Sequence, residues 1–396
     1  DWMFAQLPMY QQKGRKAFNS KLDGILTLSK QLGNPHHHFK SIHVAGTNGK
    51  GSSSHMLASI LQEAGYRVGL YTSPHLKDFR ERIRINGKPI SEIHVVDFIA
   101  KHKSFITSNR FSFFEMTVGM AFDYFAKEEV DISIIEVGLG GRLDSTNIII
   151  PEISLITNIG YDHMDMLGDT LEKIAFEKAG IIKEHIPVVV SEYQIEIASV
   201  FKKIANEKSA KLTFASTSSF PDYTTSLLGD YQQRNIKGVL ETLRGLNGFK
   251  VDAVHIQNGL QNVNVNTRIQ GRWQILQENP RVICDTAHNK EGLVLVLKQL
   301  QEQRFKQLHL VLGFVKGKDL DEILPLFPKK ATYYFCKPSI PRGLDAEILA
   351  AKAKKYDLKG MAYDSVNEAY EAVNEAASKA DLIFIGGSNF IVAEVL

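Results

Sequence analysis

The chain has 396 residues, 44% apolar and 23% charged, with a net charge of +3. This length predicts two domains, and the small net charge gives no reason to expect a nucleic-acid partner. With only two cysteines and no apolar run near ~18 residues, we expect a cytoplasmic protein without disulfides, a thiolate zinc site or a membrane span.

Short β-branched runs alternate with amphipathic runs, which predicts an α/β fold with a mostly parallel sheet. In the first part, strands are predicted at 42–45, 68–71, 132–137, 153–158 and 188–191, and helices at 53–64, 114–125 and 171–178. Ligands of such sheets bind at the carboxyl ends of the strands. The loops after Ala45, Tyr71, Val137 and Asn158 are therefore predicted to share one ligand-binding edge.

A second series of strands is predicted at 282–285, 308–313, 332–336 and 382–385. The region 245–274 before it is polar and poorly periodic, so we place the joint between the domains near Thr267. The sequence thus predicts domains at 1–267 and 268–396, the second being smaller.

A glycine-rich loop follows the first predicted strand, with the sequence Ala45-Gly46-Thr47-Asn48-Gly49-Lys50-Gly51-Ser52. Strand, glycine loop and helix form the usual cradle for phosphates, with a lysine for the terminal phosphates and a hydroxyl for Mg²⁺. Val44 and Gly51 depart from the standard phosphate-loop pattern. The alternative is a glycine turn before an ordinary helix.

Candidate metal ligands lie at or shortly after the ends of three more predicted strands. Ser73 follows the second strand and is either a helix cap or a metal ligand. Glu136 ends an apolar strand, where a carboxylate suits either Mg²⁺ or a salt bridge. His163 lies between Asp162 and Asp165 and is a metal ligand, a general base or a structural histidine.

Three residues farther along are less specific by themselves. Lys178 has the pattern of an ordinary lysine at a helix end, stabilised by the macrodipole. Arg272 could pair with a phosphate or carboxylate, and Asp285 could accept from a ribose or an ammonium. The alternative for the Asp285 segment is a turn with an Asx cap.

Taken together, these segments resemble folylpolyglutamate synthase and dihydrofolate synthase of the Mur ligase superfamily. The matching motifs, in chain order, are Gly46–Ser52, Ser73–Leu76, Glu136–Asn147, Asp162–Gly168, Glu177–Gly180, Leu228-Gly229 with Gln232 and Asn235, Gly271-Arg272, and Asp285–Asn289. The resemblance implies an N-terminal P-loop ATPase domain that binds ATP, magnesium and folate. It also implies a smaller C-terminal, Rossmann-like α/β domain for glutamate ligation.

The activity implied is that of an ATP-dependent ligase, which adds L-glutamate to dihydropteroate, reduced folates or both through an acyl phosphate. We also expect a monomer. The alternatives are a Mur-type ligase for another carboxylate acceptor and a nucleotide-binding homologue without catalysis. The resemblance also implies two Mg²⁺ sites and a carbamylated Lys178.

The roles of individual residues follow from the same resemblance. The catalytic residues implied are Lys50, His163 and Lys178, and the metal ligands are Ser73, Glu136 and His163. The nucleotide contacts implied are Thr47, Asn48, Gly49, Lys50, Gly51, Ser52, Asn235, Arg272, Asp285 and His288. The substrate pocket implied consists of Phe113, Phe114, Glu115, Leu143, Asp144 and Ser145.

Several positions depart from the family pattern or stay outside it. Ser145, Thr286 and Lys290 replace the usual Ala, Gly and Pro, which leaves open how the second domain holds glutamate. Arg80, Arg82 and Arg84 alternate along a predicted strand. They form either a solvated strand face or a contact for a glutamate tail or phosphates.

Overall fold

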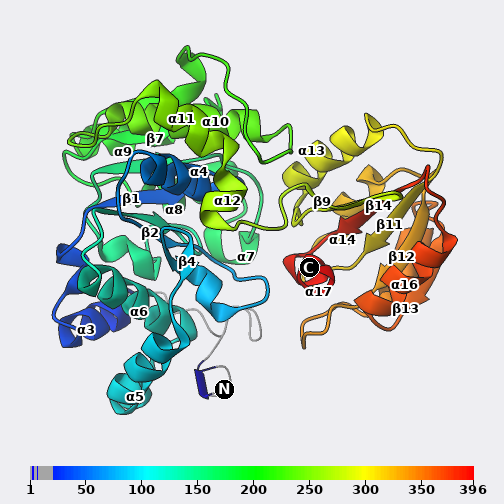
Figure 1. The fold of residues 1–396 in the computed structure, drawn as a ribbon, viewed down its shortest axis with the longest axis horizontal. Coiled ribbons are helices and arrows are strands. Elements are labelled where there is room, and N and C mark those ends of the chain that lie inside the picture. Colours follow the sequence, from blue (N-terminus) through cyan, green and yellow to red (C-terminus); the bar gives the residue numbers. More distant parts are fainter. Residues whose placement is uncertain (1, 4–6, 8–20) are drawn as a thin grey trace. The chain divides into compact units, whose positions relative to one another are not determined.

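The computed structural model describes residues 2, 3, 7 and 21–396, which form two compact units (Figure 1). The first unit comprises Asp1–Ser226 and Gln232–Ile269, and the second comprises Leu227–Tyr231 and Gln270–Leu396. The short segment Leu227–Tyr231 therefore packs with the second unit although both of its chain neighbours belong to the first.

An eight-stranded sheet forms the centre of the first unit, in the order β4-β3-β2-β5-β1-β6-β7-β8. The strands are β1 Ser41–Ala45, β2 Val68–Tyr71, β3 Ile83–Ile85, β4 Lys88–Pro89, β5 Ile132–Glu136, β6 Ile153–Ile156, β7 Val188–Val190 and β8 Leu212–Phe214. All neighbours are parallel except β3, which is antiparallel to both β2 and β4. The central strands β2, β5, β1 and β6 therefore end at the same edge.

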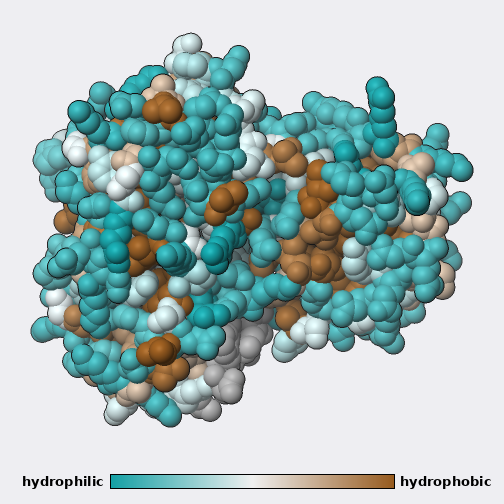
Figure 2. Space-filling view, in the orientation of Figure 1, coloured by the Kyte–Doolittle hydropathy of each residue, from teal (hydrophilic) through white to brown (hydrophobic). Residues whose placement is uncertain are grey.

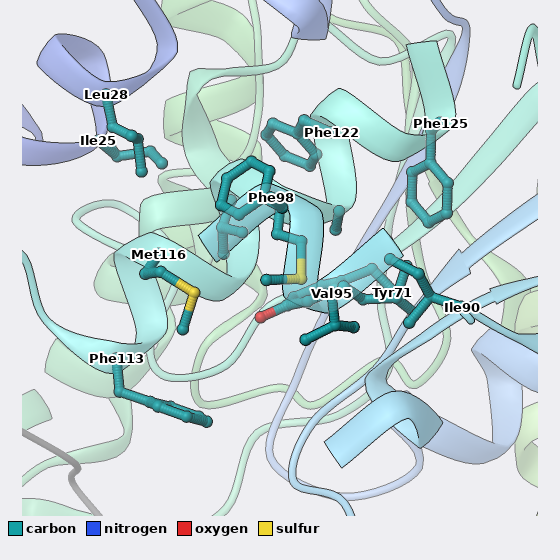
Figure 3. Close-up of a cluster of buried hydrophobic side chains, with 14 of the residues drawn as sticks. Ile25, Leu28, Tyr71, Ile90, Val95, Phe98, Phe113, Met116, Phe122 and Phe125 are labelled. Carbon is teal, nitrogen blue, oxygen red and sulfur yellow. The ribbon is translucent and has the colours of Figure 1, made fainter. Parts of the chain in front are cut away.

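Helices cover both faces of this sheet (Figure 1). One face carries α4 Lys50–Glu63, α10 Gln232–Gly245, α11 Ala253–Gln261 and α12 Val263–Thr267. The other carries α3 Asp23–Gln31, α5 Glu92–Asn109, α6 Phe113–Lys127, α8 Leu171–Ala179 and α9 Ala198–Glu207, with the short α7 Met164–Leu167 beside α8. Figure 3 shows the aromatic and aliphatic side chains of α3, α5 and α6 packed with Tyr71 of β2.

A six-stranded sheet forms the second unit, in the order β13-β12-β11-β14-β10-β9. Its strands are β9 Gln274–Glu278, β10 Arg281–Cys284, β11 Leu308–Leu312, β12 Thr332–Cys336, β13 Gly360–Tyr363 and β14 Leu382–Gly386, parallel except for the β9–β10 pair. Its helices are α13 Lys290–Gln301, α14 Leu320–Ile323, α15 Ala346–Lys354, α16 Val366–Ala376 and α17 Asn389–Val395. Two separate apolar clusters cover its two faces.

Short 3-10 turns connect several of these elements. They are η2 Pro35–His37, η3 Phe79–Arg82, η4 Ser145–Ile148, η5 Ala215–Thr217 and η6 Leu324–Leu326. Figure 2 shows that hydrophilic residues cover most of the visible face of each unit, with a larger apolar area on the second. No helix within the described part of the chain is long and apolar enough to cross a membrane.

The predicted α/β fold with mostly parallel sheets is confirmed. Two local predictions are wrong. The helix after the glycine loop begins at Lys50 rather than Ser53, because Gly49 adopts the left-handed conformation and turns the chain directly into α4. The region 245–274 is not irregular: α11 and α12 lie there, and α11 packs closely on α4 through Gly259, where a Cβ would lie 2.4 Å from the Ile60 Cα.

Candidate active site

The glycine loop between β1 and α4 is held by the end of β6. The backbone N–H of Thr47 donates to the Asn158 carbonyl at 2.8 Å, and that of Asn48 donates to the Asn158 side chain at 2.9 Å. Thr157 Oγ1 donates to the Asn48 carbonyl at 2.6 Å. A Cβ on Gly46 would lie 1.8 Å from Thr157 Oγ1, so only glycine fits there. The loop is thus held open at the N-terminus of α4, where backbone N–H groups favour an anion.

Two lysines meet at this loop. Lys50 Nζ donates to the carbonyl oxygens of Gly46 at 3.0 Å and Thr47 at 3.2 Å. Lys178, at the end of α8, donates to the same Gly46 oxygen at 2.9 Å. Lys178 is only 4% exposed, and its burial, together with the charge of Lys50, lowers its pKa to about 7. An amine with that pKa is largely neutral at pH 8, unlike the ordinary helix-end lysine that its sequence pattern suggests.

The start of α4 also contacts α10. Gln232 Nε2 donates to Ser52 Oγ at 3.1 Å, and its amide oxygen accepts from Asn235 Nδ2 at 2.7 Å. A Cβ on Gly49 would lie 2.2 Å from Asn235 Oδ1. Asn235, which the resemblance implies as a nucleotide contact, therefore lies directly against the loop.

Two of the three predicted metal ligands lie at the ends of neighbouring strands, Glu136 at the end of β5 and Ser73 in the loop after β2. Glu136 ends β5 and is 4% exposed, and its Oε2 accepts from the backbone N–H of Ser73 at 3.1 Å. β5 lies between β1 and β2, so this carboxylate is placed at the same edge as the loop. A carboxylate and a hydroxyl are hard oxygen donors that suit Mg²⁺, which usually needs only one or two protein ligands beside phosphates and water.

The third predicted ligand, His163, follows β6. It adopts a left-handed backbone, with φ of 51°, at the N-terminus of α7. Its Nε2 lies 3.7 Å from the Asp162 carboxylate, and the Asp162 carboxylate also accepts its backbone N–H at 3.0 Å. Asp162 therefore fixes this turn, a role that the sequence did not reveal. In the described part of the chain, no three His, Cys, Asp or Glu side chains cluster as a metal site.

The predicted substrate residues at the start of α6 have clear structural contacts. Glu115 is 2% exposed and forms a capping box with Ser112, which begins the helix. Phe113 lies beneath the guanidinium of Arg82, with 5.4 Å between Cζ and the ring centre. The rings of Phe114 and Tyr71 have their centres 6.2 Å apart. The Phe114 ring also packs on Gly138, where a Cβ would lie 2.5 Å from it.

The other predicted substrate residues lie in the loop after β5. Asp144 is 2% exposed and accepts from the backbone N–H groups of Leu139 at 2.9 Å and Thr146 at 3.0 Å. Burial raises its pKa, and these hydrogen bonds oppose the shift. Leu143 and Ser145 flank it and are half-buried. The loop therefore lies beside Phe114 through Gly138, at the edge that carries Glu136.

The predicted residues of the second unit surround the end of β10. Asp285 accepts from the Tyr231 hydroxyl and the Trp273 backbone N–H, each at 2.7 Å, and burial raises its pKa. Arg272 donates to Thr286 Oγ1 and to the Gly271 carbonyl. His288 Nδ1 lies 3.0 Å from the Thr286 carbonyl. Tyr231, which the sequence analysis missed, thus joins the segment Leu227–Tyr231 to Asp285.

A separate hollow of about 580 Å³ lies among α7, α8 and α9, lined by Met166, Phe176, Lys203 and Ile204 among others. None of the predicted site residues lines it.

Comparison with known proteins gives two family matches. The Mur ligase middle domain matches residues 44–275, and the Mur ligase, glutamate ligase domain matches residues 271–389. Dihydrofolate synthase/folylpolyglutamate synthase of Bacillus subtilis is 38% identical over 338 residues, covering 77% of this chain and 78% of that protein. A probable bifunctional folylpolyglutamate synthase/dihydropteroate synthase of Haloferax volcanii is 33% identical and covers 94% of this chain. The chain spans only 47% of that relative's length.

Solved structures are similar over both units. Escherichia coli FolC in complex with DHPP and ADP has a TM-score of 0.87 and 30% identity, covering 100% of this chain and 95% of that one. A bifunctional folylpolyglutamate synthase/dihydrofolate synthase with Mn, AMPPNP and L-glutamate bound has a TM-score of 0.84 and 28% identity, covering 96% and 94%.

Proposed function

Because the chain belongs to the folylpolyglutamate synthase/dihydrofolate synthase family of the Mur ligases, we propose that it uses ATP to join L-glutamate to a folate-type carboxylate. The observation that carries this proposal is the meeting of Lys50 and Lys178 at the Gly46 carbonyl, one strand away from the Ser73–Glu136 contact. The cation of Lys50, a phosphate loop and a buried carboxylate at one sheet edge are what phosphoryl transfer to a carboxylate requires.

The loop residues Thr47–Ser52 would hold the phosphates of ATP through backbone N–H groups, and Lys50 would neutralise the terminal phosphate. The acceptor carboxylate takes this phosphoryl group and ADP leaves. The amine of glutamate then attacks the acyl carbon, loses a proton and expels phosphate, forming the amide. In the second unit, we propose that Arg272, Asp285 and His288 contact the nucleotide, together with Asn235 of α10.

Ser73, Glu136 and His163 are the proposed ligands of magnesium, at two sites in all. Bound Mg²⁺ would neutralise phosphate charge during the transfer. The donor set fits this ion because Glu136 and Ser73 offer hard oxygens at the edge where the phosphates would lie. The related structure with Mn and AMPPNP bound supports the binding of a divalent metal together with a nucleotide.

We propose that Lys178 carries a carbamate. Carbon dioxide adds only to a neutral amine, and the buried Lys178 has a pKa of about 7. Loss of a proton from the adduct gives a carbamate anion in place of an ammonium. We expect the intact protein to gain the mass of one CO₂ under CO₂ at pH 8, with the adduct absent in Lys178→Ala. Full activity of Lys178→Ala without added CO₂ or carboxylate would contradict this role.

Phe113, Phe114 and Glu115, with Leu143, Asp144 and Ser145, are the proposed acceptor pocket. Tyr71 is fully buried, so of these two rings only that of Phe114, half-buried beside the buried Asp144, would be available to a flat pterin. We assign ATP, magnesium and folate binding to residues 1–267 and glutamate ligation to 268–396. We also propose a monomer in the cytoplasm, where the buried free thiols of Cys284 and Cys336 would remain reduced.

The deciding experiment measures phosphate release from ATP with Mg²⁺, L-glutamate and either dihydropteroate or tetrahydrofolate, with mass spectrometry of the products. If both acceptors gain one glutamate, the protein is a bifunctional ligase. If only one acceptor gains a glutamate, that acceptor identifies its single activity. Release with a cell-wall carboxylate instead would make it another Mur ligase. ATP binding without release would make it a non-catalytic homologue.

A further inference from the structure

The three alternating arginines of the segment 80–84 have three different environments, which contradicts a solvated strand face. Arg80 and Arg82 belong to η3, and only Arg84 lies in a strand, β3. Arg80 forms ion pairs with Asp78 at 2.6 Å and Glu92 at 3.2 Å. Arg82 is buried, and its Nε donates to His75 Nδ1 at 2.7 Å.

Arg84 is 6% exposed, and its Nε is buried without a hydrogen-bond partner among the described residues. The two carboxylates nearest in sequence are already engaged. Glu81 accepts the backbone N–H groups of residues 76–78, and Asp78 pairs with Arg80. Glu81 and Asp78 still attract the charge of Arg84, but neither accepts a hydrogen bond from its Nε. Because a buried guanidinium cannot lose its proton, a further anion that accepts this hydrogen bond would stabilise it.

A second arginine lies close to Arg84. Ile83 and Ile85 belong to the apolar cluster beneath α5 and α6, so Arg84 points to the opposite face, which α4 and α12 cover. The hairpin of β3 and β4 packs on the end of α12, because a Cβ on Gly87 would lie 2.0 Å from the Asn266 carbonyl. Burial lowers the pKa of Arg84, and repulsion from Arg268, which is exposed directly after α12, adds to this shift. The packing of the hairpin on α12 brings the segments of Arg84 and Arg268 together, and an anion bound between the two guanidinium groups would relieve their repulsion.

This pair is near the candidate active site. Arg84 is paired in register with Leu70 of β2, three residues before Ser73, which corresponds to roughly 10 Å along an extended chain. Each glutamate added to the acceptor brings a further carboxylate, so a tail that crosses the strand ends from the face of the proposed acceptor pocket to that of Arg84 would carry one to this pair.

We propose that Arg84 and Arg268 form an oxyanion site that binds a carboxylate of the γ-glutamyl tail or a free phosphate. The tail assignment rests on the proposed function, whereas the oxyanion site does not. Arg84 is the buried base of the site and Arg268 is its exposed rim.

Calorimetric binding of two probes, the γ-linked glutamate trimer and inorganic phosphate, tests the site without any turnover. Arg84→Met should weaken binding of the preferred probe about tenfold or more, the effect of one charge-assisted hydrogen bond. Arg268→Asn should weaken binding in the same way. Arg268 is exposed, and asparagine tolerates the left-handed backbone at this position (φ 55°), so this variant should fold even if Arg84→Met misfolds. Arg67→Met, which removes an exposed arginine paired with Glu128, is the matched control and should bind as the wild type does.

Loss of trimer binding in both variants identifies the tail as the ligand, and the KM for a triglutamylated folate should then rise while that for dihydropteroate stays constant. Loss of phosphate binding alone identifies free phosphate. Unchanged binding of both probes in both variants overturns the site. If both variants lose probe binding but the wild-type protein has no ligase activity, the proposed function is refuted and the oxyanion site is still supported.

Discussion

Lys178 and Lys50 share the carbonyl oxygen of Gly46, at 2.9 and 3.0 Å. The contact joins the end of α8 to the loop between β1 and α4, residues 132 positions apart in the chain. The unusual chemistry of Lys178 comes from its burial there and from the charge of Lys50, which together favour the neutral amine.

The free energy of unfolding should depend on pH through Lys178. Its pKa is about 7 when folded and 10.5 when exposed, so the unfolded chain binds more protons between these values. The resulting destabilisation is complete below pH 7 and disappears as the pH rises toward 10.5. In urea unfolding experiments in CO₂-free buffer, the free energy of unfolding of Lys178→Met should therefore rise relative to that of the wild type as the pH falls from 10 to 6. The expected gain is roughly a few kcal/mol.

Lys173→Met provides the control for this series, because Lys173 is an exposed lysine of the same helix, paired with Asp169. Its stability should follow that of the wild type at every pH. Parallel curves for Lys178→Met and wild type would show that Lys178 is not held neutral by the fold.

Lys50→Met should abolish most of the turnover and leave folding nearly intact. The loop is held by Thr157 and Asn158, independently of the lysine. The transferring phosphate would lose its cation, which predicts a fall in kcat of about 10²- to 10³-fold by analogy with other preorganised electrostatic contacts. Rapid-quench measurement of ADP formation, alongside a urea unfolding curve, separates the two effects. A kcat within about twofold of wild type would remove Lys50 from the phosphate site.

Glu136→Gln keeps the shape of the side chain and its acceptor for the Ser73 N–H, but removes the charge. A buried amide oxygen is a much poorer ligand for a hard cation than a carboxylate. We expect Mn²⁺ affinity, followed by electron paramagnetic resonance in the presence of AMPPNP, to fall at least about tenfold. Glu115→Gln is the matched control, since Glu115 is a buried carboxylate that caps α6. Equal Mn²⁺ affinity in Glu136→Gln and wild type would exclude Glu136 as a ligand.

The sequence predicted the main features of the fold and the site edge because they depend on local patterns. The strands β1, β2, β5 and β6 are short apolar runs, and the polar residues that follow them meet once the strands are parallel. The glycines at 46 and 49 mark the loop for the same local reason, their need for unusual backbone angles.

Long-range burial could not be predicted in this way. Arg84 alternates with isoleucines as a solvated strand residue would, yet α12, about 180 residues later, packs on its hairpin. The sequence around Lys178 likewise gives no indication that its side chain contacts the Gly46 carbonyl. Tyr231 and Gln232 are adjacent, but they contact Asp285 of the second unit and Ser52 of the first, so no local signal assigns them.

The two glycines Gly49 and Gly65 allow backbone strain to be separated from contact with Asn235. Both have positive φ, 83° and 88°, but a Cβ on Gly49 would lie 2.2 Å from Asn235 Oδ1, whereas nothing lies within 4 Å of one on Gly65. Gly65→Ala should cost only the strain, about 1 kcal/mol. Gly49→Ala should cost more and also displace Asn235, weakening ADP binding measured by calorimetry. Equal unfolding free energies and equal ADP affinities in the two variants would show that the contact between the loop and α10 does not shape the nucleotide site.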